Sequence, residues 1–216
     1  PRLTRDGEKI NSFFCQSSFA EFAVVPASGV VKVPRDVELK RLAGLSCGIA
    51  TGLGASMIRA PVQPGATVAV LGAGGVGIAT MFGARALNAK SVIAIDQVSS
   101  KVEAALSLGA ATEGIVAEAD VVEQILTQSP RGNGVDYFFD AVGGPSTMET
   151  GIAATRNGGT ICAIGIMHAD LEYNVPIRGL INEKIITGTN GGSIEPRADI
   201  PRFIVMLKSN LLTKVR

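Results

Sequence analysis

The sequence is poor in the features that mark secreted, membrane-bound or nucleic-acid-binding proteins. Its three cysteines, Cys15, Cys47 and Cys162, are too few and too scattered to form a disulfide framework. No apolar run approaches the roughly 18 residues that a membrane-spanning helix needs. The net charge of +1 gives no electrostatic reason to expect nucleic acid or an anionic membrane as a partner. A reducing, cytoplasmic setting is therefore the expected location.

The opening stretch, PRLTRDGEKINSFF, lacks the apolar core of a secretion signal. It also begins with Pro1 instead of Met, so we expect a processed or trimmed chain. Internal repeats, low-complexity tracts and Ser- or Pro-rich linkers are missing as well. The 216 residues, 46% hydrophobic and 18% charged, are nevertheless enough to bury a sizeable core.

Short apolar runs alternate along the chain with segments of helical periodicity. The runs are nearly continuous, which is typical of parallel strands covered by helices on both faces. Expected strands cover residues 67–72, 91–96, 112–116, 134–142, 159–165 and 183–189. Expected helices cover residues 75–88, 99–110, 118–129, 146–155 and 199–210, with Ser99 or Ser100 as the N-cap of the second. This alternation predicts an α/β fold, a doubly wound Rossmann domain with a six-stranded parallel sheet.

The region before residue 45 has a different character. Residues 18–34 contain β-branched runs broken by Pro26 and Pro34, which favours antiparallel strands and turns. We expect this region to be the end of a separate β-rich domain whose beginning is not in this chain.

The stretch GAGGVG places Gly72, Gly74 and Gly77 in a G-x-G-x-x-G pattern between an expected strand and an expected helix. Gly72 permits the tight turn, Gly74 lets the backbone approach a pyrophosphate, and Gly77 lets helix and strand pack closely. The free N–H groups and partial positive charge of the helix start favour phosphate. We expect Gly75 and Val76, in the same turn, to contact the cofactor as well.

An acid stands at the end of the next expected strand. Asp96 follows Gly77 by 19 residues, close to the spacing at which a carboxylate accepts hydrogen bonds from the adenosine ribose. Because a carboxylate there repels a 2′-phosphate, NAD is expected to be preferred over NADP. The alternative interpretation is a merely tight strand-to-helix turn with a surface aspartate.

Several segments together resemble the zinc-dependent alcohol dehydrogenases of the medium-chain dehydrogenase/reductase superfamily. LSCGIATGLGA (45–55) resembles the Cys-Gly-x-x-Thr-Gly segment that precedes the coenzyme domain in that family. PGATVAVLGAGGVG (64–77) is similar to its first coenzyme strand, and AIDQVSSK (94–101) to its ribose-binding segment. GVDYFFDAVG (134–143) and GGTICAIGI (158–166) resemble its fourth and fifth coenzyme strands.

The resemblance implies reversible hydride transfer between an alcohol or aldehyde and NAD, with a catalytic zinc polarising the oxygen. Carried over by position, Cys47 would be a thiolate ligand of that zinc, and Thr51 would lie by the nicotinamide ring. Asp96 and Lys101 would hold the adenosine ribose, although Lys101 can equally be a solvated helix-face lysine. The resemblance places Ala141 and Val142 at the adenine side, and Ile164, Gly165, Ile166, Gly188 and Asn190 at the nicotinamide end.

Only one of the three protein ligands of such a zinc can be placed, because family sites of this kind use two cysteines and a histidine. The only histidine, His168, is more readily interpreted as an exposed loop residue. Cys47 is either an orphaned ligand or a partly buried small hydrophobe, while Cys15 and Cys162 are expected to be core thiols. The stretch NGGS (190–193) is expected to be a plain turn unless the cofactor reaches it.

We therefore expect a fragment of a longer enzyme. Residues 1–46 would be the end of a GroES-like catalytic domain and linker, residues 47–190 the NAD-binding domain, and residues 191–216 a helical segment leading back to the catalytic domain. A homodimer or homotetramer joined through the coenzyme sheet is implied. Two alternatives stay open: a zinc-free reductase resembling quinone oxidoreductases, and a nucleotide-binding module that is not catalytic as an isolated chain.

Overall fold

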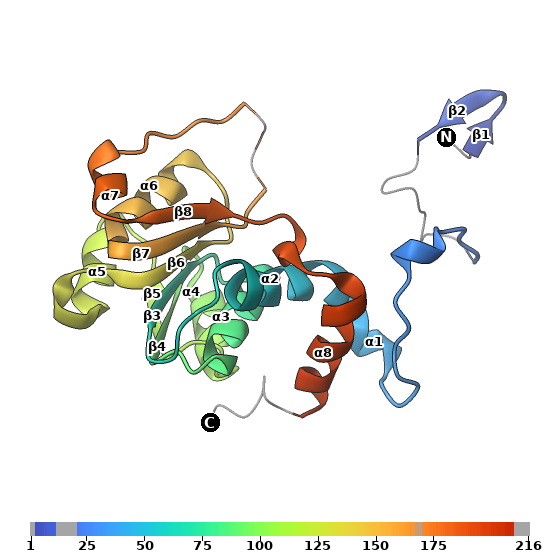
Figure 1. The fold of residues 1–216 in the computed structure, drawn as a ribbon, viewed down its shortest axis with the longest axis horizontal. Coiled ribbons are helices and arrows are strands. Elements are labelled where there is room, and N and C mark those ends of the chain that lie inside the picture. Colours follow the sequence, from blue (N-terminus) through green and yellow to red (C-terminus); the bar gives the residue numbers. More distant parts are fainter. Residues whose placement is uncertain (1–2, 12–20, 167, 169, 210–216) are drawn as a thin grey trace. The chain divides into compact units, whose positions relative to one another are not determined.

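The computed structural model describes residues 3–11, 21–166, 168 and 170–209. The chain divides into two units, Pro1–Val37 and Glu38–Arg216. The second unit contains the parallel sheet and all the helices of four or more residues among the described residues (Figure 1). In the described part of the chain, no helix is both long and apolar enough to cross a membrane.

The first unit contains a small antiparallel hairpin. Its strands are β1 (Leu3–Arg5) and β2 (Glu8–Ile10), joined by Asp6 and Gly7, whose φ angles are 53° and 83°. Positive φ at both turn residues is the geometry that an Asp-Gly pair favours in two-residue hairpins. The strands predicted within residues 18–34 are wrong for the described part, residues 21–34, which holds only the short helix η2 (Ala27–Gly29). Val24, Val25 and Val30 are exposed there, and apolar runs without a buried face do not stabilise strands.

The second unit is built on a six-stranded sheet in the order β5-β4-β3-β6-β7-β8, with every neighbouring pair parallel. This order confirms the predicted doubly wound fold, because the chain starts at the centre and turns back at the β3/β6 boundary. The strands are β3 (Thr67–Leu71), β4 (Ser91–Asp96), β5 (Glu113–Val116), β6 (Val135–Asp140), β7 (Thr155–Ala163) and β8 (Ile185–Gly188).

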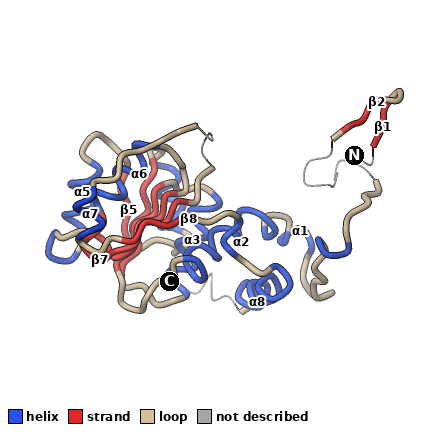
Figure 2. The backbone as a smooth tube through the Cα atoms, turned by 45° about the horizontal axis from the view of Figure 1, so that its top comes forward, coloured by secondary structure: helices blue, strands red, loops and turns tan. Residues whose placement is uncertain are grey.

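Helices cover both faces of this sheet (Figure 2). On one face, Val68, Val70 and Phe139 pack with Met81 of α3 (Gly75–Ala86) and with Ala105 of α4 (Ser99–Ser107), and the helix α2 (Ala50–Gly54) packs on α3. On the other face, Phe138 and Ile161 pack with side chains of α5 (Val121–Gln128) and α6 (Pro145–Ala154). Alternate strand residues point to opposite faces of the sheet, and helices cover both faces. The central strands are therefore buried along their length, which explains their continuous apolar runs.

The remaining helices are short or terminal to the sheet: α1 (Leu39–Leu42), the π-helical turns η3 (Leu45–Ile49) and η4 (Ala55–Arg59), the short turns η5 (Pro130–Gly132) and η6 (Gly191–Ser193), α7 (Ile177–Ile181) and α8 (Pro196–Lys208). The predicted serine N-cap of α4 is wrong. Val98 occupies that position without a side-chain cap, because the preceding turn is already closed by Asp96, which accepts from the Val98 N–H at 3.0 Å.

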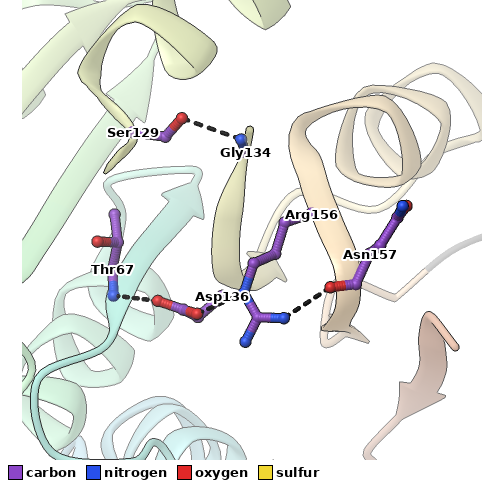
Figure 3. A network of polar contacts seen from close by, with 6 residues as sticks. All are labelled: Thr67, Ser129, Gly134, Asp136, Arg156 and Asn157. Atoms are coloured by element: carbon purple, nitrogen blue, oxygen red, sulfur yellow. Dashed lines mark hydrogen bonds and ion pairs between the residues drawn. The ribbon is translucent and has the colours of Figure 1, made fainter. Parts of the chain in front are cut away.

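A polar network joins the strands at their amino ends (Figure 3). Asp136, near the start of β6, accepts from the Thr67 N–H at 2.7 Å and from Arg156 Nε at 2.6 Å. A second guanidinium nitrogen of Arg156 donates to the Asn157 carbonyl at 2.6 Å. The network therefore links β3, β6 and β7 at the edge opposite to the glycine-rich turn.

Candidate functional site

The turn after β3 is shaped by two of its glycines. Gly72 has a φ of 97° and donates its N–H to the Ile95 carbonyl at 2.7 Å, which anchors the turn on β4. A Cβ at Gly77 would overlap the carbonyl oxygen of Gly72. Positive φ and lack of space require glycine at these two positions, whatever binds outside.

Packing within the chain does not require glycine at the other two positions of the turn, Gly74 and Gly75. A Cβ built on Gly74 or on Gly75 would meet no heavy atom within 4 Å. Gly74 is the N-cap of α3 and has extended backbone angles, so the first N–H groups of the helix face this open space. The corner therefore leaves room at the positive end of a helix, where a phosphate can lie against the backbone.

Asp96, at the end of β4, is an acidic side chain in direct contact with this corner. Its side chain is 10% exposed; it accepts from the Ala73 N–H at 2.9 Å and lies 3.5 Å from Lys101 Nζ. Burial by itself raises the pKa of Asp96. The N–H groups of Val98 and Ala73, together with the charge of Lys101, outweigh burial and lower this pKa below its usual value of 3.8. Asp96 is therefore a carboxylate at neutral pH.

A cavity of about 600 Å³ opens beside Asp96. It lies at the carboxyl ends of β3, β4, β5 and β6, including the β3/β6 boundary at which the strand order reverses, and this is where open α/β sheets bind ligands. Among the predicted residues, the structure gathers Gly72, Asp96, Lys101 and Val142 around it. The other lining residues are Leu71, Ile95, Gln97, Val98, Ala117, Glu118, Val121, Ser146, Thr147 and Thr150.

A buried acid at the end of β6 was missed by the sequence analysis. Asp140 is fully buried and accepts from the N–H groups of Val142 at 3.0 Å and Gly143 at 2.9 Å. Its second carboxylate oxygen accepts from the Thr147 hydroxyl at 2.6 Å. Asp140 thus fixes the turn between β6 and α6 that forms one wall of the cavity. An acid closing an apolar strand, three residues before the pair Gly143-Gly144, was the available signal.

The residues predicted for the nicotinamide end are not among those that line that cavity. Gly165 is one of them, and a Cβ there would overlap the backbone of Val142 and Gly143. Ala141, predicted with Val142 for the adenine side, does not line the cavity either and donates its N–H to the Leu71 carbonyl at 2.8 Å. The remaining predicted residues of this end follow β7 or end β8: Ile164, which is buried, Ile166, which is 96% exposed, Gly188 and Asn190. The predicted set therefore falls into one group around the cavity and a second group at the ends of β7 and β8.

The segment that contains Cys47 and Thr51 packs on the start of α3. Cys47 lies in η3 and is exposed, and Thr51 lies in α2 and is half-buried. A Cβ on Gly52 would overlap the Val76 carbonyl oxygen, so α2 contacts the first turn of α3 backbone to backbone. The fold therefore places both residues beside the helix start that forms the glycine corner.

The turn after β8 also packs on α2. The Gly192 carbonyl fills the place of a Cβ on Gly54, and Gly192 has a φ of 77°. Thr189 and Ser193 join their hydroxyl groups at 2.8 Å across this turn. The stretch 190–193 is therefore a packed element of the second unit as well as a turn.

No metal site forms among the residues that the structure describes, since no three His, Cys, Asp or Glu side chains are grouped closely enough. Cys162 is buried in the core as predicted, and burial raises its pKa to about 11 despite the charge of Arg59. Cys15 lies outside the described residues. His168 is an exposed loop residue 3.3 Å from an Asp170 oxygen.

Sequence comparisons point to one family. Residues 75–209 match the family described as "Zinc-binding dehydrogenase". Alcohol dehydrogenase 1 of Pisum sativum is 33% identical over 205 residues, covering 94% of this chain and 54% of that protein. Alcohol dehydrogenase class-3 of Caenorhabditis elegans is 33% identical over 214 residues, again covering 94% of this chain and 54% of the relative. The chain spans about half the length of these curated relatives.

Structure comparisons agree. Benzyl alcohol dehydrogenase from Acinetobacter calcoaceticus superposes with a TM-score of 0.88 at 32% identity, covering 93% of this chain and 55% of that chain. An alcohol dehydrogenase zinc-binding domain protein from Burkholderia ambifaria gives a TM-score of 0.87 at 34% identity, covering 93% and 54%. The glycine corner, the strand order and both sets of relatives lead to one conclusion: the chain belongs to the zinc-binding dehydrogenase family.

Proposed function

We propose that this chain is the coenzyme-binding part of an NAD-dependent, zinc-type alcohol dehydrogenase, which transfers hydride between an alcohol or aldehyde and NAD. One observation carries the proposal. The glycine corner leaves open space at Gly74 and Gly75, and a buried carboxylate, Asp96, borders a large cavity on the same edge of the sheet. A dinucleotide needs a phosphate-binding helix start and a ribose-binding acid in that arrangement.

The residues present fit NAD. The N–H groups at the start of α3 would bind the pyrophosphate, and Asp96 with Lys101 would hold the adenosine ribose. Oxygens of Asp96 still have lone pairs for ribose hydroxyls, since a carboxylate offers about four acceptor positions. Thr51, Ile164, Gly165, Ile166, Gly188 and Asn190 would line the nicotinamide half. When bound, NAD supplies the hydride acceptor; the chain positions it.

The described residues alone do not fit a catalytic zinc ion. Such a site needs three protein ligands, and Cys47 has no second and third ligand within the described residues. In the proposed enzyme Cys47 contributes one thiolate, and the other ligands come from outside the described residues. Its exposed position next to the start of α3 is compatible with that role.

The lone Cys47 also favours a second candidate, a zinc-free reductase of the same superfamily. Metal analysis of the full-length protein separates the two. Stoichiometric zinc, with activity lost to a chelator, supports the alcohol dehydrogenase. Full activity without bound metal supports the reductase.

The decisive experiment for the coenzyme is calorimetric titration of the folded chain with NAD and with NADP. We expect NAD to bind and NADP to bind at least tenfold more weakly, because the Asp96 carboxylate repels the 2′-phosphate. Binding of neither dinucleotide contradicts the proposal. Binding of NADP alone contradicts the role of Asp96.

We further propose that the protein assembles through the open edge of its sheet. β8 is the edge strand, its Ile185 is 56% exposed, and Ile177 and Ile181 of α7 are 70% and 74% exposed. An unpaired apolar edge promotes association with a second copy. Light scattering on the chain and on an Ile185→Lys variant tests this: the chain should be dimeric or tetrameric, and the variant should dissociate.

A further inference from the structure

The Thr147 hydroxyl can offer a ligand in the cavity only its lone pairs, because its proton is already used in a hydrogen bond. It lies 2.6 Å from Asp140 Oδ2 and 2.9 Å from the Gly144 carbonyl oxygen, and both partners are acceptors. A hydroxyl has one proton and two lone pairs, so the proton is committed to one of these two oxygens. What remains of the hydroxyl for a ligand is its lone pairs.

This polarity is fixed by a rigid frame. Asp140 is fully buried, and its other oxygen is held by the N–H groups of Val142 and Gly143. Thr147 lies in the first turn of α6 and lines the same cavity as Asp96. A ligand that enters the cavity with its ribose at Asp96 therefore meets a second lining group, the Thr147 hydroxyl, whose hydrogen bonds leave it only lone pairs to offer.

We propose that Thr147, oriented by Asp140, selects the base of the coenzyme by accepting a hydrogen bond from the exocyclic amine of adenine. Adenine carries an amino group at this position, whereas hypoxanthine and guanine carry a carbonyl oxygen. A carbonyl would place lone pairs against lone pairs and leave the Thr147 acceptor without a donor. The inference rests on the proposed function, since it needs the adenosine half of a dinucleotide in this cavity.

The test compares NAD with its hypoxanthine and guanine analogues by calorimetric titration of the folded chain. One hydrogen bond is worth about a fivefold difference in Kd, so NAD should bind about fivefold more tightly than either analogue. Thr147→Val removes both the hydrogen bond to NAD and the repulsion of the carbonyl, so it should weaken NAD without weakening either analogue and bring the ratio of dissociation constants to about one. Thr147→Ser should keep the ratio.

Asp140→Asn tests the orienting role. Since the N–H groups of Val142 and Gly143 require an oxygen at the Oδ1 position, the new amide nitrogen would face Thr147 and use one of its lone pairs. The difference in dissociation constant between NAD and the two analogues should then become smaller. A purely structural role of Asp140 would weaken all three dinucleotides equally and overturn this part.

Two control variants remove other polar groups of the same cavity. Thr150→Val deletes a hydroxyl that donates to the Ser146 carbonyl one turn further along α6, and Glu118→Gln neutralises an exposed acid. Both should preserve the ratio, and a ratio that collapses in either one instead of in Thr147→Val overturns the assignment. Equal binding of all three dinucleotides by the unmodified chain overturns the inference alone. Failure of NAD itself to bind overturns the proposed function.

Discussion

Two carboxylates at opposite ends of the parallel strands have similar hydrogen-bond partners but differ in the open space beside them. The amino edge and the carboxyl edge are the sides of the sheet at which the strands begin and end. Asp136 at the amino edge and Asp96 at the carboxyl edge each accept from a backbone N–H next to or within β3, and each has a cationic partner. Arg156 lies 2.6 Å from Asp136 and is also held by the Asn157 carbonyl. Lys101 lies 3.5 Å from Asp96 and is 51% exposed, against 43% for Arg156. Asp96 and Lys101 share a cavity of about 600 Å³, whereas Asp136 and Arg156 share one of about 230 Å³ and Arg156 lines a further one of about 470 Å³.

The comparison separates structural polar groups from groups that can exchange partners. At the amino edge the donors and acceptors satisfy one another, and Gly134 and Gly159 are packed against backbone, although Gly65 faces open space. At the carboxyl edge, Gly74 and Gly75 face open space and the cation is loosely held. Substitutions at the amino edge should therefore change stability, and substitutions at the carboxyl edge should change binding.

The largest expected effects come from the glycines. Gly134 has a φ of 99°, and a Cβ there would lie 2.5 Å from the Ala154 carbonyl oxygen, so Gly134→Ala should lower the free energy of unfolding by about 3 kcal/mol. Gly74→Val should change it by less than about 1 kcal/mol, yet weaken NAD binding about a hundredfold by filling the place of the pyrophosphate. Urea unfolding and calorimetric titration measure the two quantities. Strong destabilisation by Gly74→Val would break the comparison.

Substitution of the two aspartates should likewise affect binding at the carboxyl edge and stability at the amino edge. Asp96→Asn should weaken NAD about tenfold and reduce the discrimination against NADP, because it removes the charge that excludes the 2′-phosphate. Asp136→Asn should lower stability by about 1 kcal/mol, since Arg156 is partly exposed, and leave NAD affinity unchanged. An unchanged NADP preference in Asp96→Asn would show that Asp96 does not reach the ribose.

The pH dependence of stability offers a smaller, independent test of Asp96. Its pKa is lower in the folded chain than the ordinary 3.8, so its contribution is fully present above about pH 5 and is lost as the pH falls through the folded-state pKa. The difference in unfolding free energy between the unmodified chain and Asp96→Asn should therefore be constant from pH 7 to 5 and shrink below 3.8. A difference that grows on acidification would mean that burial dominates this pKa.

The smallest expected effect belongs to Lys101. Its side chain is half-exposed, so Lys101→Met should weaken NAD only about two- to threefold and leave stability within about 0.5 kcal/mol. The matched change at the amino edge, Arg156→Met, should leave NAD affinity unaltered. It should lower the free energy of unfolding more than Lys101→Met does, because it also breaks the hydrogen bond to the Asn157 carbonyl. Equal effects of the two variants on NAD would remove the distinction between the edges.

The sequence was sufficient for the sheet and for the glycine corner. Strands buried on both faces have continuous apolar sequences, which can be recognised without a structure. The G-x-G-x-x-G pattern and Asp96 lie within 25 residues of one another, so their spacing can also be read directly from the sequence. Asp140 was missed because its three donors become its neighbours only when the turn after β6 folds back on it. The valines of residues 21–34 were misleading because strand propensity needs a pairing partner, whereas Asp6-Gly7, a true hairpin signal, lay unnoticed among polar residues.

The helix α2 is confined between two backbones, with Val76 of α3 against Gly52 and Gly192 of η6 against Gly54. Only the side chains of Ala79 and Ile194 lie beside these backbone contacts, so little there can change rotamer to absorb a displacement. Enlarging Gly52, Gly54 or Gly192 singly would therefore press on the backbone of α3, η6 or α2. Substitutions in this region are therefore better placed at its exposed side chains than at these three glycines.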